Sequence, residues 1–237
     1  MSIYAQGAYE IRCEWGGYGV ELAGAGGAAC VIVDVFSFST CVDVATARGA
    51  KVYPYRSRDS GAAGFAKSLE GFAAGPRQEG GYSLSPASLV DLPPGRNLVL
   101  PSPNGSTLTL SAEAELVIAG CLRNAPAVAE RLAGYGGAVT IVPAGERWPD
   151  GSLRPAIEDL IGAGAIIHGL RGPKSPEARI AESAFLAVRG NLLHVLKDSV
   201  SGRELCDMGF PQDVDVATEF DVSTTVPVFS EGCFVAG

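Results

Sequence analysis

The sequence has few of the residues that most often carry nucleophilic and zinc chemistry. It contains two histidines, His168 and His194, and its six cysteines form no C-x-x-C pair. A zinc site is therefore not expected, and neither is a Ser-His-Asp triad, which would also need a G-x-S-x-G turn that is absent. Both histidines fall in apolar helical segments, where we expect packed side chains rather than catalytic bases. The scattered cysteines are typical of buried thiols in a reduced compartment.

Positive charge is also scarce. Eighteen lysines and arginines stand against 26 acidic residues, which gives a formal net charge of −8. Nucleic acid is a poor partner for such a chain, because phosphate backbones require clustered Lys and Arg. An acidic protein that binds a small anion needs a few placed arginines or a metal ion to hold it.

Long apolar runs and targeting signals are missing as well. No run approaches the ~20 apolar residues of a membrane span. The first fifteen residues lack the basic and apolar regions of a signal peptide. We therefore expect a cytoplasmic protein without a membrane partner; a homodimer is one assembly that the sequence permits.

Two common nucleotide-binding motifs are absent. The chain has no G-x-x-x-x-G-K-[ST] loop, and no G-x-G-x-x-G follows a predicted strand. A nucleotide-dependent oxidoreductase therefore has little support.

What the sequence does contain is a repeated alternation of strand and helix patterns. Apolar residues make up 47% of the chain, and continuous apolar runs predict buried parallel strands. The predicted strands are 28–35, 50–55, 97–102, 115–120 and 138–145. The predicted helices between and after them are 39–49, 60–72, 125–136 and 154–170. This order predicts an α/β fold with a mostly parallel sheet and flanking helices.

The pattern changes after residue 172. Residues 175–199 read as a nearly unbroken helical stretch, and 213–237 alternate like a terminal pair of strands. We therefore divide the chain into an α/β region that carries the site, 1–172, and a C-terminal helical and strand portion, 173–237. No linker separates the two parts, so a domain boundary is not readable.

The stretch PSPNGSTL (101–108) can be interpreted in two ways. Asn-Gly between apolar runs is a common hairpin turn. Here it follows a buried strand and precedes a short helical pattern, which favours a loop at the carboxyl end of a strand, where open α/β sheets bind ligands. On that interpretation Asn104, Gly105 and Ser106 bind phosphate.

Asp34 closes the strand pattern VIVD and is the first candidate for chemistry. A carboxylate at that edge suits a magnesium ligand or a nucleophile, although it could also cap the next helix. Ser39 and Thr40 follow at a helix start, where free N–H groups favour either phosphate or ordinary capping.

A second group of charged residues follows the strand at 138–145. Arg147 and Arg154 are candidates to bind substrate anions, and Glu158 and Asp159 lie in the first turns of the next helix. The acidic pair either complements the helix dipole or contributes to a metal and anion site. Adjacent helix positions diverge by about 100°, so the two cannot both face one small site without distortion of the backbone. Asn124, after the strand at 115–120, either binds a ligand oxygen or caps a helix.

The ordered segments resemble the 2-phosphosulfolactate phosphatase (ComB-like) family. The parallels are VIVDVFSFSTCVDVATARGA, SLSPASL, PSPNGSTLTL, GCLRNAPAVAE, VPAGERWPDGSLRPAIEDLIGAGAI and the tail from 201 to 229. The resemblance spans nearly the whole chain. It implies an Mg²⁺-dependent phosphatase of distinctive α/β architecture, with roles for Asp34, Asn104, Gly105, Asn124, Glu158 and Asp159.

The chain departs from that family's pattern at several positions. Ser37 stands where the family usually has an arginine, and Leu84 stands where it has an asparagine. GPRQEGG (75–81) replaces a Gly-Glu-Arg segment. A lysine could not reproduce the bidentate hydrogen bonding of the missing arginine. Arg147 and Arg154 are therefore the candidates to compensate for its loss.

We therefore expect a phosphatase acting on a small anionic phosphomonoester. Asp34, Glu158 and Asp159 would be the catalytic carboxylates, with Asp34 and Glu158 as the magnesium ligands. The attacking group is either metal-bound water or Asp34. The alternative is a non-catalytic protein that binds a phosphorylated metabolite on the same scaffold.

Overall fold

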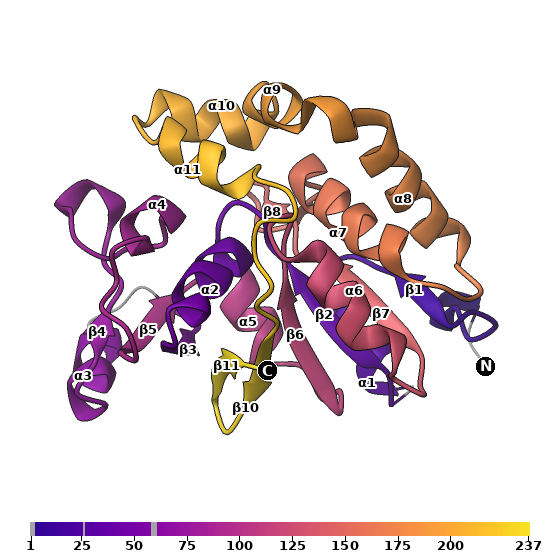
Figure 1. Ribbon diagram of the computed structural model, residues 1–237, viewed down its shortest axis with the longest axis horizontal. Helices are drawn as coiled ribbons and strands as arrows, with labels where there is room; N and C mark the ends of the chain where they lie inside the picture. Colours follow the sequence, from indigo (N-terminus) through magenta and orange to yellow (C-terminus); the bar gives the residue numbers. More distant parts are fainter. Residues whose placement is uncertain (1–2, 26, 58–60) are drawn as a thin grey trace.

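The computed structural model describes residues 3–25, 27–57 and 61–237. Within these ranges a large sheet has the strand order β1-β7-β2-β6-β10-β11-β3-β5-β4, and a small hairpin pairs β8 with β9 (Figure 1). The strands are β1 Ile11–Cys13, β2 Ala29–Val33, β3 Lys51–Tyr55, β4 Phe72–Ala73, β5 Asn97–Pro101, β6 Leu116–Gly120, β7 Val139–Pro143, β8 Glu146–Arg147, β9 Leu153–Arg154, β10 Pro227–Ser230 and β11 Cys233–Ala236.

The predicted α/β class and a mostly parallel sheet are confirmed. Each of the five predicted strands coincides with an observed one, namely β2, β3, β5, β6 and β7. The helices are α1 Gly16–Ala25, α2 Phe38–Ala47, α3 Gly61–Ser68, α4 Pro86–Leu89, α5 Gly105–Thr109, α6 Ala125–Ala133, α7 Ile157–Gly169, α8 Pro176–Val188, α9 Leu192–Lys197, α10 Val200–Asp207 and α11 Pro211–Ala217. In the described ranges, none of these helices has the length and apolar character that crossing a membrane requires.

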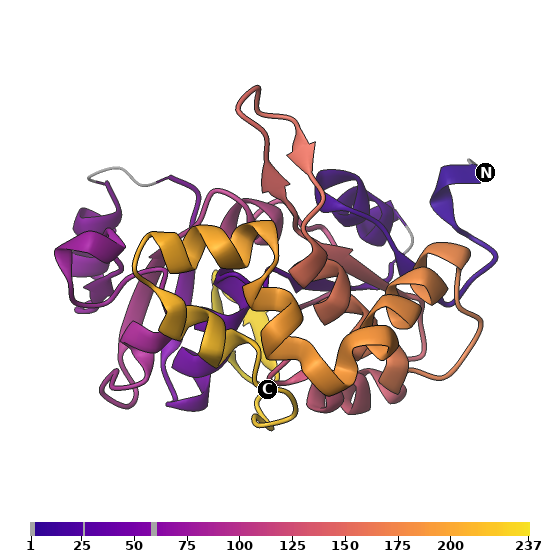
Figure 2. The same ribbon diagram turned by 90° about the horizontal axis from the view of Figure 1, so that it is seen from above.

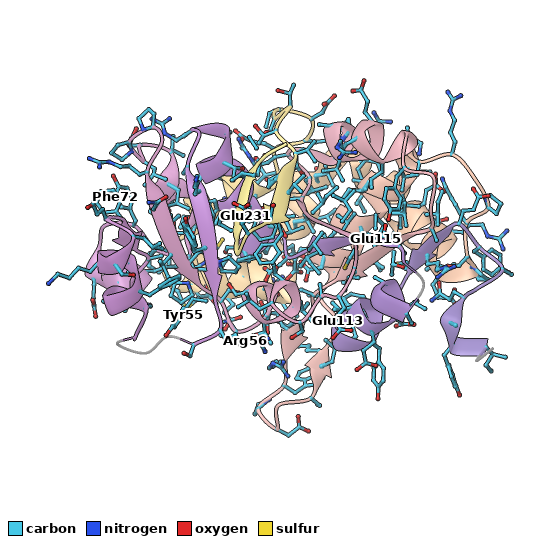
Figure 3. The ribbon with its side chains drawn as sticks, turned by 90° about the horizontal axis from the view of Figure 1, so that it is seen from below. Tyr55, Arg56, Phe72, Glu113, Glu115 and Glu231 are labelled. Carbon is cyan, nitrogen blue, oxygen red and sulfur yellow. The ribbon has the colours of Figure 1, made fainter. Side chains whose placement is uncertain are left out.

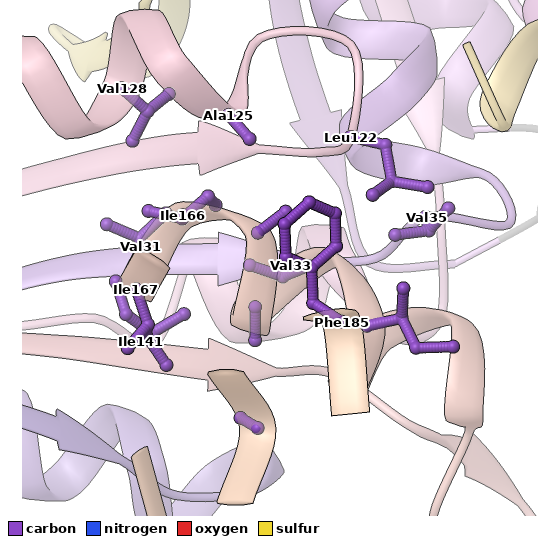
Figure 4. Close-up of a cluster of buried hydrophobic side chains, with 14 of the residues drawn as sticks. Val31, Val33, Val35, Leu122, Ala125, Val128, Ile141, Ile166, Ile167 and Phe185 are labelled. Atoms are coloured by element: carbon purple, nitrogen blue, oxygen red, sulfur yellow. The ribbon is translucent and has the colours of Figure 1, made fainter. Parts of the chain in front are cut away.

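The central strand β2 explains why its sequence is continuously apolar. All five of its residues are buried, because helices cover both faces of the sheet. Val31 and Val33 belong to a cluster with Ile166 of α7 (Figure 4). Cys30 and Ile32 point to the opposite face and join a cluster with α1 and α5. The alternation of side chains along the strand thus builds two cores at once.

The C-terminal hairpin lies in the middle of the sheet. β10 pairs antiparallel with β6 through Val228 and Ile118, and β11 pairs antiparallel with β3 through Phe234 and Val52. Its tight turn has positive φ at Glu231, 51°, and Gly232, 83°, as a type I′ hairpin turn requires. Figure 3 shows Glu231 on this hairpin. The hairpin joins the parallel strands β1-β7-β2-β6 to the parallel strands β3-β5-β4.

The rest of the C-terminal portion differs from its predicted form. The helical stretch from 175 to 199 is interrupted by a 3₁₀ turn at Arg189–Asn191, and residues 211–217, expected in part as strand, form α11. Only the later part of 213–237 is a strand pair. Helices α10 and α11 lie over one end of the sheet, and the β8–β9 hairpin projects from the body (Figure 2). Gly164 lets α7 approach α8 closely, because an added Cβ there would lie 2.0 Å from the Ala181 carbonyl oxygen.

A buried ion pair ties α2 to the end of β6 and to the C-terminal portion. Arg123 Nε donates to Asp43 Oδ2 at 2.9 Å, and Ser223 Oγ donates to Asp43 Oδ1 at 2.6 Å. Arg123 also pairs with Glu219. The Asp43 side chain is fully buried. Burial raises the pKa of its carboxyl group, and Ser223 and Arg123 oppose that rise.

The prediction that both histidines are packed side chains is wrong. His168 and His194 are exposed, and His168 Nδ1 lies 3.1 Å from Glu182 Oε1. His168 is exposed because it lies in the last turn of α7, beyond the buried part of that helix, and His194 lies on the exposed face of α9. All six cysteines are free thiols, and five of them are buried.

Candidate functional site

The PSPNGSTL stretch is a turn between a strand and a helix, not a hairpin. Strand β5 ends at Pro101 and α5 begins at Gly105, with Asn104 at the N-cap. The Gly105 N–H donates to Asp34 Oδ2 at 3.0 Å. The loop therefore does present a backbone N–H group to an anion, but that anion is the protein's own carboxylate.

Asp34 lies at the carboxyl end of β2 with both oxygens held by backbone donors. Oδ1 accepts from the Phe38 N–H at 3.0 Å, so the side chain satisfies the first turn of α2 as well as the loop at Gly105. Its side chain is nevertheless 6% exposed and lines a cavity. Burial, aided by the nearby charge of Glu158, raises the pKa of Asp34 to about 6 against the lowering effect of the N–H donors. Each oxygen keeps a lone pair for a further partner.

The cavity has a volume of about 760 Å³ and collects residues from distant parts of the chain. Asp34 from the end of β2, Asn104 from the loop after β5 and Glu146 from β8 form part of its wall. Ser201 and Leu205 of α10 form another part. The C-terminal portion therefore contributes directly to the site.

Glu146 belongs to the charged segment that follows β7, but no individual role was predicted for it. Asn104 Nδ2 donates to Glu146 Oε2 at 2.9 Å, which joins the two loops across the cavity. Burial, with the charges of Asp34 and Glu158, raises the pKa of Glu146 to about 7. A carboxylate whose pKa lies near neutrality suits general acid–base chemistry. Its position, three residues after the end of β7, was the available signal.

Glu158 and Asp159 diverge, as adjacent positions on a helix must. Asp159 accepts from the Val35 N–H and the Gly145 N–H, both at 2.8 Å, and so bonds the backbones that follow β2 and β7. Glu158 is 2% exposed and hydrogen-bonds to Ser201. Burial is the main cause that raises the pKa of both carboxyl groups, and Asp34 and Glu158 add to the effect at Asp159. The geometry gives Asp159 a positioning role behind the cavity.

The helix that carries these two carboxylates begins at Ile157, three residues later than the predicted start at 154. Residues 153–154 form β9 instead, with Arg154 opposite Glu146 in the hairpin. Arg147 lines the cavity and also donates to the Gly151 carbonyl at 2.9 Å. Arg154 Nη2 donates to Ser201 Oγ at 3.0 Å, so this guanidinium supports the cavity wall beside Glu158.

Five of the six candidate phosphate-binding residues lie outside the cavity wall, which includes only Asn104 of this set, and the Gly105 N–H is already bonded to Asp34. Ser39, Thr40, Ser106 and Asn124 are fully buried. The three hydroxyl groups donate to the backbone carbonyls of Ile32, Val35 and Leu100, respectively. The Asn124 side chain accepts from the Cys121 N–H and donates to the Thr225 carbonyl. Of the alternatives open for these residues, the geometry favours local structure over ligand binding.

Arg77 is a second site residue that the sequence did not single out. Its Nη2 donates to Ser37 Oγ at 2.6 Å, and its Nε donates to Asp213 Oδ2 at 3.1 Å. Arg77 and Ser37 both line the cavity. The guanidinium therefore reaches position 37 from the segment that follows β4.

Ready-made metal coordination is absent from the described ranges. No three His, Cys, Asp or Glu side chains there are close enough together to hold an ion. Mg²⁺ rarely uses such a cage, since one or two carboxylates, waters and substrate phosphate complete its shell. The charge of Glu158 raises the pKa of Asp34, and the charges of Asp34 and Glu158 raise the pKa of Glu146, so a cation would relieve this repulsion. The donor set fits a magnesium ion on these grounds.

Comparison with known proteins places the chain in a family. A family model described as 2-phosphosulpholactate phosphatase matches residues 21–232. The chain belongs to this family. A protein of Carboxydothermus hydrogenoformans named "Probable 2-phosphosulfolactate phosphatase" is 32% identical over 222 residues, 89% of this chain and 90% of the relative. One of Methanothermobacter thermautotrophicus named "2-phosphosulfolactate phosphatase" is 30% identical over 216 residues, 87% of this chain and 89% of the relative.

A third 2-phosphosulfolactate phosphatase relative shows the same extent of similarity. The "Probable 2-phosphosulfolactate phosphatase" of Pseudothermotoga lettingae is 29% identical over 213 residues, 87% of this chain and 91% of the relative. The resemblance inferred from the ordered segments is thus confirmed.

Proposed function

We propose that the protein is a phosphatase that hydrolyses a small anionic phosphomonoester with the help of Mg²⁺. The observation that supports this most is the cavity at the carboxyl end of β2, where Asp34 and Glu146 face one space and Glu158 lies behind it. Membership of the family supports hydrolysis of a phosphate ester bond, because the relatives carry the name 2-phosphosulfolactate phosphatase.

Asp34 and Glu158 would hold the metal ion, as expected from the sequence. When bound, Mg²⁺ would neutralise charge on the phosphoryl oxygens and lower the pKa of water. The chain's own residues then bind and orient the ester. Arg147 and the side-chain amide of Asn104 face the cavity as donors for the phosphoryl group.

Hydrolysis breaks the bond between phosphorus and the ester oxygen, and the departing oxygen must gain a proton. Glu146 supplies it, because a pKa near 7 leaves much of this carboxyl group protonated at neutral pH. The water that provides the new P–O bond returns a proton to Glu146. The attacking oxygen belongs either to that water or, in a two-step reaction, to Asp34.

The test is release of inorganic phosphate from a panel of phosphomonoesters that includes 2-phosphosulfolactate and 2-phospholactate. Each ester is assayed with Mg²⁺ and with EDTA, for the wild type and for Asp34→Asn. The exposed Asp150→Asn in the β8–β9 hairpin is the matched control. We expect release with Mg²⁺ only, lost in Asp34→Asn and retained in Asp150→Asn.

Failure to release phosphate from any ester, with thermal stabilisation by some of them, would sink the phosphatase assignment. It would favour the non-catalytic binding protein instead. Equal release in EDTA would remove the metal from the proposal and leave Glu146 and the arginines as the machinery.

A further inference from the structure

The cavity has a second end whose chemistry differs from the phosphoryl end. Six of the residues that line it there are apolar and come from α3, β4 and the segments around α4 and α10: Ala62, Ala63, Ala73, Ala74, Leu84 and Met208. Ala62 and Ala74 are buried, Ala73 and Leu84 are half-buried, and Ala63 and Met208 are exposed, so this end is partly open to solvent. Helix α3 and strand β4 lie at one side of the molecule, away from the β8–β9 hairpin (Figure 1). The cavity volume, about 760 Å³, falls within the roughly 300–1,000 Å³ of sites that enclose ligands of drug size. A three-carbon ester would leave this end unfilled.

Arg77 lies between the two ends, since it contacts Ser37, three residues beyond Asp34. Its guanidinium is held in a fixed orientation. Asp213, which is fully buried, accepts from Arg77 Nε, and the Phe210 ring lies 5.9 Å below the guanidinium carbon. Asp213 is itself fixed by Ser85 Oγ and by the Ala87 N–H.

The fixed guanidinium still has N–H groups to offer. The bonds to Ser37 and Asp213 use two of the five donors of an arginine side chain. Arg77 retains 15% exposure of its side chain, on the cavity wall. A planar donor group oriented in this way suits a carboxylate.

The charges that line the cavity limit how many anionic groups a substrate can carry. Among the protein's own groups, two guanidinium groups, Arg77 and Arg147, stand against three carboxylates, Asp34, Glu146 and Glu204. The proposed Mg²⁺ would be neutralised by its carboxylate ligands and the phosphoryl group. Arg147 lies beside Glu146 at the phosphoryl end, which leaves Arg77 for one further anion. Position 37 is a neutral serine. A sulfonate in addition to a carboxylate would therefore lack a cationic partner, and contact with the buried Ala62 and Ala74 would cost it part of its hydration.

We propose that the substrate is a phosphorylated 2-hydroxy acid whose carboxylate pairs with Arg77 and whose remaining substituent is an apolar group larger than methyl. The apolar substituent occupies the end lined by α3 and β4 and takes the place of the sulfonate. This proposal rests on the proposed phosphatase function and names its substrate class.

The first experiment compares kcat/KM for four 2-phosphorylated acids whose third substituent is methyl, isobutyl, benzyl or sulfomethyl, the last being 2-phosphosulfolactate. We expect the isobutyl or benzyl ester to exceed the methyl ester by roughly 10- to 200-fold, the range that one or a few buried methylene groups provide. A preference for the sulfomethyl ester overturns the proposal.

Ala63→Trp tests where the substituent binds. It narrows the apolar end and should lower the ratio of kcat/KM for the isobutyl ester to that for the methyl ester. Lys67→Trp is the control, because it lies on the same helix, is exposed and is not part of the cavity wall. An unchanged ratio in Ala63→Trp would place the substituent elsewhere and overturn this part of the assignment.

Arg77 is tested with an ester that lacks the carboxylate. Arg77→Lys should lower kcat/KM for the carboxylate esters by about a hundredfold or less and affect an isobutyl-type alkyl phosphate far less. Arg77→Met would leave the Asp213 carboxylate without its ion-pair partner, so this variant is combined with Asp213→Asn to protect folding. An equal loss for both kinds of ester would make Arg77 a structural residue and overturn its role as carboxylate partner.

The two proposals fail in different ways. If esters are hydrolysed but their order does not follow apolar size, the phosphatase function stands and the substrate class falls. If none is hydrolysed, the phosphatase function is refuted. The shift in melting temperature that each ester causes then still ranks how well the esters bind. A larger shift with the apolar esters would support binding of the apolar substituent at the end lined by α3 and β4, and a larger shift with the sulfonate would refute it.

Discussion

Gly105 offers a severe test of how tightly the loop after β5 is packed against α2. A Cβ atom added at this position would lie 2.2 Å from Phe38 Cδ1, 2.4 Å from Cγ and 2.8 Å from Cβ. Carbon atoms in contact are ordinarily about 3.5–4.0 Å apart. Gly105→Ala therefore requires the loop or the Phe38 ring to move by more than about 1 Å. Phe38 is fully buried, and its ring packs edge-on against the Phe234 ring with the two centroids 6.0 Å apart, so it has little space into which it could move.

Overpacking of a core typically costs about 1–3 kcal/mol, and the shortness of these contacts places Gly105→Ala at the upper end. For a chain of this size each kcal/mol corresponds to roughly 2–4 °C, so the melting temperature should fall by roughly 6–12 °C. Displacement of the loop also weakens the bond from the Gly105 N–H to Asp34. A shift of this kind at a catalytic group can lower kcat by roughly a hundredfold.

Denaturant unfolding and calorimetry measure the stability change, and phosphate release measures the activity. Gly64→Ala is the matched control, because an added Cβ in this α3 position meets nothing within 4 Å. It should stabilise the protein by about 0.5–1 kcal/mol. The double variant with Phe38→Leu should recover part of the loss. A Gly105→Ala protein with wild-type melting temperature and activity would refute the packing described for this loop.

Three further outcomes follow from other contacts. Asp159→Asn places an amide donor against the Val35 or Gly145 N–H and should destabilise the protein by about 1.5–3 kcal/mol in urea unfolding, whereas Asp150→Asn should not. Arg123→Met leaves the buried Asp43 unpaired and should cost about 3 kcal/mol or more, with much of the loss restored when Asp43→Asn is added; equal stabilities of the single and double variants would contradict the ion pair. Burial raises the pKa of Asp34 in the folded protein to about 6, against 3.8 for a free aspartate. Metal-free protein should therefore lose up to about 3 kcal/mol of stability as pH rises from 4 to 7, and Mg²⁺ should raise the melting temperature more at pH 8 than at pH 5.5. A Mg²⁺ shift that is independent of pH would count against a cation held by these carboxylates.

The strands were predictable because burial on both faces leaves a direct trace in composition. The runs around Val31, Val99 and Ile141 are almost continuously apolar, with Thr140 as the polar exception in β7, and none of the three strands lies at an edge of the sheet. The turn at Asn104 was also predictable, since strand and helix patterns on either side removed the hairpin alternative. The location of Asp34 near the end of a predicted strand was enough to indicate where the cavity lies.

Other features leave no such trace in a single sequence. The location of β10 and β11 in the middle of the sheet depends on pairing between Phe234 and Val52, which lie 182 positions apart in the chain. Glu146 lies in the two-residue strand β8 and Arg77 in a 3₁₀ turn, and their importance depends on which distant groups they reach. Ser39 and Thr40 have the same residue types as a phosphate-binding turn, but the fold uses their hydroxyl groups for backbone carbonyls.

The position of the β10–β11 hairpin also has a consequence for how the protein is made. Residues 227–236 leave the ribosome after every other strand of the large sheet, although they lie between β6 and β3. Until they emerge, the facing edges of two parallel half-sheets have unpaired backbone groups, which are sites for pairing with other chains. The nascent protein is therefore most prone to aggregate just before its synthesis reaches this hairpin, and a slow step in translation there would prolong that exposure.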